Sequence, residues 1–136
     1  MRKTGLLFFA ALSLSSSVVF GFGEKHSKVE TKANVVGQNL EIEVLVKPDA
    51  DMQISKEGPW QVAFTQAPGL NLEMKDGKFV SKAFDESVPG FKVTAPIASD
   101  AKSGRIDYDV KAFVCSKDKT KCFPQQHKGT IDWKKS

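Results

Sequence analysis

Strict alternation of apolar and polar residues is the feature that most limits how this chain can fold. Leu40, Ile42, Val44 and Val46 alternate with Glu41, Glu43 and Lys47, and the same period of two recurs along the chain. The other repeats lie near residues 28–36, 60–64, 70–74, 91–97, 106–114 and 131–133. A period of two places the apolar side chains on one face of a strand, whereas a helix needs a period near 3.6. The pattern therefore predicts strands with one buried face.

The segments between these repeats predict an antiparallel arrangement. Pro48-Asp49-Ala50-Asp51 and Ala67-Pro68-Gly69 interrupt the pattern, and the Asp76-Gly77 step suits a two-residue hairpin turn. No segment between the repeats has helical periodicity, and alternation argues against parallel strands, which are buried on both faces. We predict an all-β, immunoglobulin-like antiparallel sandwich of about seven or eight strands.

The beginning of the chain has the pattern of a secretory signal peptide. Arg2 and Lys3 precede an apolar run over residues 6–22, and small glycines mark its end. The alternative is an uncleaved anchor, but the run is near the minimum of about 17–25 residues that spans a bilayer, and it contains serines. We expect residues 1–23 to be removed, which leaves residues 24–136 as one domain outside the cytoplasm.

The charge balance gives little support for nucleic acid or a membrane surface as a partner. The chain has 20 Lys+Arg and 16 Asp+Glu residues, and removal of Arg2 and Lys3 leaves 18 and 16, a net charge of +2. Charges of both signs alternate along the strands, as on a solvated face. We expect no nucleic acid, no cofactor, membrane contact only through an uncleaved signal peptide, and a monomer.

Cys115 and Cys122 carry the most specific chemical signal. An even number of cysteines in an exported chain favours a disulfide. Residues 116–121 are polar, as in a loop between adjacent strands, and cysteines facing across such a hairpin meet the distance requirement for a bond. The ring is short, so the bond would contribute only about 2.5 kcal/mol on the chain-entropy model. We expect the bond to lie on the surface, where another protein can reach it.

The loop between the cysteines bears on whether this bond exchanges. Lys117, Lys119 and Lys121 surround it, and cationic neighbours stabilise a thiolate. The negative charge of Asp118 disfavours the thiolate. The residues alone leave two interpretations open, an exchangeable disulfide and an inert staple.

The cysteine segment also resembles a known family. The strand near residues 106–114 runs into Phe-Val-Cys, a short polar loop and Cys-Phe-Pro. With the signal peptide and the predicted sandwich, this resembles the N-terminal periplasmic domain of the DsbD family of transmembrane reductants, an immunoglobulin-like sandwich with a redox-active cysteine pair. The resemblance is close over residues 115–124 and loose elsewhere. It implies a periplasmic module that takes electrons from a thioredoxin-like domain and passes them to thioredoxin-fold partners.

The resemblance also implies roles for particular residues. Cys122 would form the mixed disulfide with a partner, and Cys115 would resolve it. The family shields its disulfide with an aromatic side chain of a cap loop. Phe84, which lies beside two acidic residues, is the candidate for this shield, with Phe123 as a local one.

The chain departs from the family pattern in two ways. A member of the family has one residue fewer between its cysteines, so the ring geometry can differ. This chain also shows neither a membrane domain nor a thioredoxin-like domain with Cys-x-x-Cys. We therefore expect a separate membrane reductant as its source of electrons.

Two other function classes compete with this hypothesis. One is a binding or structural domain whose hairpin disulfide is inert. The other is a copper or zinc carrier that combines the cysteines with His26 or His127. We expect both histidines to be exposed and apart, which predicts no metal site, and we expect Trp60, Trp133 and Tyr108 to lie in the core. The sequence leaves open whether the protein is an enzyme.

Overall fold

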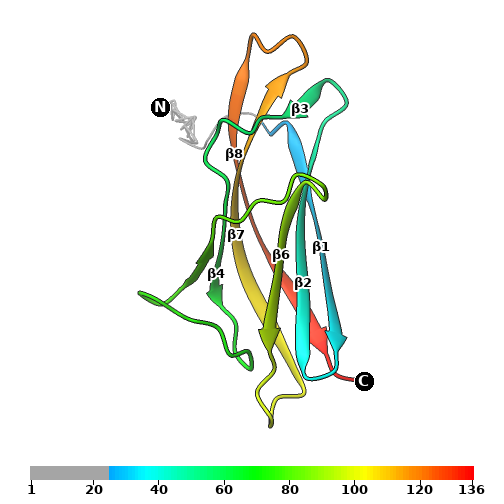
Figure 1. Ribbon diagram of the computed structural model, residues 1–136, viewed down its shortest axis with the longest axis vertical. Helices are drawn as coiled ribbons and strands as arrows, with labels where there is room; N and C mark the ends of the chain where they lie inside the picture. Colours follow the sequence, from blue (N-terminus) through cyan, green and yellow to red (C-terminus); the bar gives the residue numbers. More distant parts are fainter. Residues whose placement is uncertain (1–24) are drawn as a thin grey trace, which may run out of the picture.

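The computed structural model describes residues 25–136 (Figure 1). Over this range the chain forms eight strands and no helix. The strands are β1 (Ser27–Val36), β2 (Asn39–Pro48), β3 (Met52–Ile54), β4 (Gln61–Gln66), β5 (Phe79–Ser81), β6 (Gly90–Pro96), β7 (Ser103–Ser116) and β8 (Cys122–Lys134). The strand pairings are antiparallel, which confirms the predicted all-β sandwich. The predicted signal peptide, residues 1–23, lies outside the described residues.

Two sheets make up the sandwich. One contains β1, β2 and β6 in that order, and the other is centred on β7. β8 pairs with one edge of β7, while β3 and β4 pair with different parts of its other edge, and β5 pairs with β4. The long strands β7 and β8 run side by side, and their hairpin lies at one end of the molecule, at the top of Figure 1. The C-terminus lies at the other end.

The alternating apolar residues form the core, as predicted. Burial alternates along β2, and the buried residues of both sheets belong to one cluster. Trp60 and Trp133 are 7 % and 4 % exposed, which confirms their predicted place in this core. Tyr108 is half-buried against it, and burial raises the pKa of its phenol. The other side chains of the cluster are Leu40, Ile42, Val44, Val46, Val62, Phe64, Phe91, Val93, Ile97, Ile106, Val110, Ala112 and Ile131.

The region between β4 and β6 differs in part from the sequence prediction. The predicted Asp76-Gly77 turn is confirmed, because both residues have positive φ angles of 55° and 78°, as a type I′ turn requires. The strand predicted over residues 70–74 does not form, and Leu70 makes only an isolated bridge with Ile97. A hydrogen bond from the backbone N–H of Asn71 to the carbonyl of Pro96 (2.8 Å) holds this segment at the end of β6 instead.

Candidate functional site

The register of β7 and β8 places the two cysteines opposite each other. Cys115 and Cys122 are the last pair of the ladder, with their Cα atoms 4.0 Å apart, and they form the predicted disulfide. The next pair outward is hydrogen-bonded, because the N–H of Ser116 donates to the carbonyl of Lys121 (2.7 Å). The cysteines therefore occupy a non-hydrogen-bonded pair, where facing Cα atoms of antiparallel strands lie closest together.

The tip of this hairpin is organised by Asp118. Its carboxylate accepts hydrogen bonds from the hydroxyl of Ser116 and from both the N–H and the hydroxyl of Thr120 (3.1 and 2.8 Å). These bonds lower the pKa of Asp118 to about 2, so it stays ionised at any physiological pH. The loop thus keeps a fixed negative charge among its three lysines, and the surroundings of the disulfide are less cationic than the lysines alone would make them.

The two cysteines differ sharply in their access to solvent. Cys115 is 4 % exposed, whereas Cys122 is exposed. The strand order explains the difference, because Cys115 lies between β8 and β3, where it pairs with Gln53, while β8 is the edge strand of its sheet. An approaching sulfur atom can therefore reach the side of the bond that Cys122 contributes more readily than the side that Cys115 contributes.

A loop of residues 55–59, which follows β3, lies against the same region. Its backbone is fixed at Ser55, whose N–H donates to the carbonyl of Phe113 (3.0 Å) and whose carbonyl accepts from the indole N–H of Trp60 (2.7 Å). Gly58 lies so close to the Phe113 side chain that a Cβ at this position would sit 2.6 Å from Phe113 Cδ1 and closer still to Cβ and Cγ. The loop can make this approach only because residue 58 is glycine.

Together, the 55–59 loop and the hairpin enclose a hollow of about 310 Å³ beside the disulfide. Cys115, Cys122 and Lys119 line it from the hairpin, and residues 53–57 line it from β3 and the loop. Sequence reasoning did not identify this loop. The sequence signal for this loop is the Gly58-Pro59 step immediately before the core residue Trp60. That step marks a turn but does not reveal what the turn covers.

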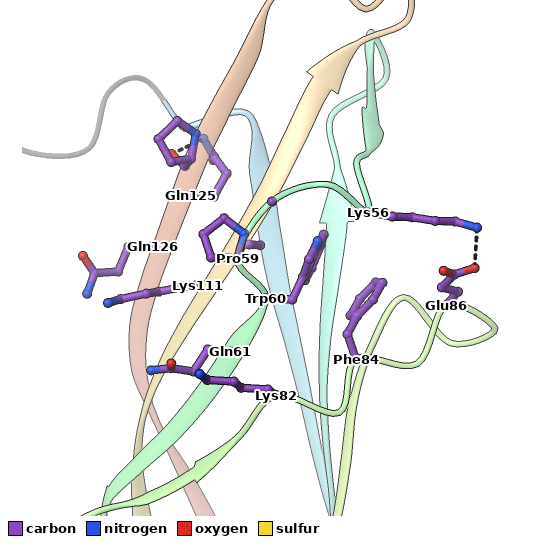
Figure 2. A pocket seen from close by; sticks show the side chains of 13 residues that line it. Lys56, Pro59, Trp60, Gln61, Lys82, Phe84, Glu86, Lys111, Gln125 and Gln126 are labelled. Carbon is purple, nitrogen blue, oxygen red and sulfur yellow. Dashed lines mark hydrogen bonds and ion pairs between the residues drawn. The ribbon is translucent and has the colours of Figure 1, made fainter.

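The two phenylalanines proposed as shields lie elsewhere. Figure 2 shows the ring of Phe84 beside Trp60, on which it stacks with 3.9 Å between centroids. Phe123 stacks on His26 with 4.1 Å between centroids. Neither ring lines the hollow beside the disulfide, and shielding by either residue stays a prediction. The loop of Phe84 is nevertheless joined to the 55–59 loop, because Lys56 and Glu86 form an ion pair of 2.7 Å (Figure 2).

The expectation that both histidines are exposed is wrong, because His127 is only 9 % exposed and His26 is half-buried. The Nε2 atom of His127 lies 2.8 Å from the hydroxyl of Ser27, which also bonds Gln125 Oε1 (2.9 Å). Burial, with a contribution from Lys25, lowers the pKa of His127, so the ring is neutral near pH 7. The reason for the correction is that β8 begins at Cys122, so alternation turns His127 inward against β1. This polar cluster joins the two sheets.

Residues 25–136 contain no group of three or more histidine, cysteine or acidic side chains placed to hold a metal ion. In the same range, no helix is both long enough and apolar enough to cross a bilayer. Comparison of the chain with protein-family models, with curated proteins and with solved structures finds no match.

Proposed function

We propose that the protein is a periplasmic thiol–disulfide exchange module that passes electrons between thioredoxin-fold proteins through Cys115 and Cys122. The observation that carries the proposal is the unequal exposure of the two cysteines at the end of a surface hairpin. The resemblance of residues 115–124 to the DsbD domain supports the same division of roles. A separate membrane reductant would supply the electrons.

In the reductive half of the cycle, the thiolate of a dithiol partner attacks Sγ of Cys122. The bond between the two protein sulfurs breaks, and Sγ of Cys115 leaves as a thiolate and takes a proton from water. The partner's second thiolate then attacks the partner sulfur of the mixed disulfide, and Cys122 leaves as a thiolate. Two electrons have passed to this chain, and the partner now holds a disulfide.

In the oxidative half, the Cys122 thiolate attacks the disulfide of the next protein and displaces one of its sulfurs. The Cys115 thiolate then attacks Sγ of Cys122, which restores the original bond and releases the second sulfur of the substrate as a thiolate. The register supports this resolving step, because the β7–β8 ladder keeps the two cysteines directly opposed. Lys119, which lines the hollow beside the bond, favours the thiolate forms on which both halves depend, while the ionised Asp118 opposes this effect.

Single-cysteine variants test the proposal. Cys115→Ser leaves the exposed Cys122 and should accumulate mixed disulfides with thioredoxin-fold proteins in the periplasm, visible as non-reducing gel bands identified by mass spectrometry. Cys122→Ser is the matched control, because its remaining thiol is the buried one and should capture far less. Equal capture by both variants would contradict the assigned roles, and no thioredoxin-fold protein captured by either variant would remove the proposal.

The competing assignment is a binding or structural domain in which the bond only fixes the hairpin tip. It is favoured by the continuous β7–β8 ladder, which shows the tip to be a regular extension of the sheet. The reduction potential of the purified protein separates the two assignments. An exchange protein should equilibrate between about −120 and −270 mV, whereas an inert structural disulfide should lie below about −300 mV.

A further inference from the structure

A second hollow, of about 590 Å³, is lined in part by Lys56, Gly58 and Pro59 of the 55–59 loop. Pro59, Trp60, Phe84 and Pro124 contribute its apolar surface. Figure 2 shows that Lys82 and the neighbouring polar side chains reach toward the side of the hollow away from the two aromatic rings. We call this hollow the lysine groove. Its size is within the range of about 300–1,000 Å³ that is typical of ligand sites.

The lysine groove adjoins the exposed sulfur. Lys56 lines both the groove and the hollow beside the disulfide. Pro124 also lines the groove, and it follows Cys122 by two residues on β8, so both side chains lie on the same face of the sheet about 7 Å apart. A polypeptide whose cysteine is bonded to Cys122 can therefore place a neighbouring side chain in the groove.

The charges of the groove select an acidic occupant. Lys56 is neutralised by Glu86 (2.7 Å), but neither Lys82 nor Lys111 forms an ion pair with another described residue. Both side chains are exposed, so their ammonium groups attract carboxylates as solvated charges do, and the attraction weakens as salt is added. Asp109, on the same sheet face as Lys111, accepts hydrogen bonds from the amide of Gln126 (2.9 and 3.0 Å) and forms an ion pair with Lys128 (4.0 Å).

We propose that the lysine groove seats an acidic segment that flanks the reactive cysteine of the exchange partner. An apolar side chain of the segment lies on Pro59 and Pro124, and its carboxylates pair with Lys82 and Lys111. The inference rests on the proposed exchange function and adds to it the chemistry by which a partner is chosen. Attraction between opposite charges raises the rate of encounter more than it raises the affinity.

Synthetic peptide thiols test this proposal on the oxidised full-length protein. Three peptides share an acetylated cysteine, a glycine and a leucine, and end in two glutamates, two glutamines or two lysines. The rate at which each reduces the Cys115–Cys122 bond is divided by its rate with dipyridyl disulfide, which corrects for thiol reactivity. The glutamate peptide should exceed the glutamine peptide by about three- to tenfold in low salt, and the lysine peptide should be slowest. The advantage should largely disappear in about 0.5 M NaCl.

The double variant Lys82→Gln/Lys111→Gln should bring the glutamate and glutamine peptides to equal rates. Lys28→Gln/Lys32→Gln is the matched control, because it removes the same charge from the exposed β1 and should keep the preference. Equal rates in the unmodified protein, a preference that persists in the first variant, or a preference that is lost in both variants would refute the groove but leave exchange intact. Failure of every peptide to reduce the bond would instead refute the exchange function and the groove with it.

Discussion

The close approach of Gly58 to Phe113 makes a quantitative prediction for Gly58→Ala. The added Cβ would lie 2.6 Å from Phe113 Cδ1, whereas carbon atoms in favourable contact are about 3.5–4.0 Å apart. The 55–59 loop must therefore move away from β7 by at least about 1 Å. The backbone angle is not the difficulty, because Gly58 does not have a positive φ.

The energetic cost of Gly58→Ala follows from two opposing contributions. Overpacking costs about 1–3 kcal/mol, and the loss of glycine flexibility in the unfolded chain returns about 0.4–1 kcal/mol. We expect the free energy of unfolding to fall by about 1–2 kcal/mol, measured by urea denaturation of the oxidised protein. The displaced loop should also widen the hollow through which a thiolate approaches Sγ of Cys122, so dithiothreitol should reduce the bond faster, by at most about tenfold for each 1.4 kcal/mol by which loop opening becomes easier.

Gly77→Ala is the control that separates local opening from general destabilisation. Gly77 has a φ of 78° and no atom within 4 Å of an added Cβ, so alanine there costs only backbone strain of about 1–2 kcal/mol. It should lower stability by a similar amount but leave the reduction rate unchanged, because the Asp76-Gly77 turn does not line the hollow. A Gly58→Ala variant that changes neither quantity, or a Gly77→Ala variant that accelerates reduction equally, would contradict the role assigned to the 55–59 loop.

Two further substitutions test the titratable residues His127 and Asp118. Burial lowers the folded-state pKa of His127 below its ordinary value of 6.5, so the unfolded chain binds the proton more readily, and the free energy of unfolding should be full above about pH 6.5 and decline as the pH falls below it. His127→Gln should remove that decline in urea titrations between about pH 7 and 5. An unchanged pH profile would contradict the assigned burial of His127. Asp118→Asn removes a permanent negative charge beside the bond, so reduction by anionic glutathione should become about two- to threefold faster at low salt. The gain in rate should disappear at high salt. A change that does not depend on salt would point to a rearranged hairpin instead.

The parts of the fold that the sequence predicts are those in which burial is periodic. Leu40 to Val46 and Ile106 to Val114 repeat with period two over a full strand, and both segments have the predicted burial. The same period fixes the register of the last ladder pair, so the disulfide could be anticipated from Cys115, Cys122 and the polar loop between them. A local sequence pattern is therefore sufficient to predict a strand wherever one face of that strand is apolar.

The structure departs from the prediction where polar residues are buried or where contacts are non-local. The sequence predicts a return strand that begins at Cys122 and a strand near Ile131. Gln125 and His127 between them give no apolar signal, yet both face the interior and are hydrogen-bonded to Ser27. The 55–59 loop was missed for a different reason. Its role comes from contact with Phe113, more than 50 residues away in the chain, and no local pattern of residues encodes that contact.

The position of the disulfide within the ladder determines how the domain can tolerate its loss. β7 and β8 stay paired from Ser103–Lys134 to the cysteine pair, so the sheet does not need the bond to align its strands. The bond lies beyond the residues of the core cluster and closes a short ring, whose entropic contribution is about 2.5 kcal/mol. If the proposed exchange takes place, opening the bond should leave the sandwich folded, with Cys115 still held between β8 and β3. A disulfide that joined the two sheets would have neither property, because its reduction would release the packing that positions the resolving sulfur.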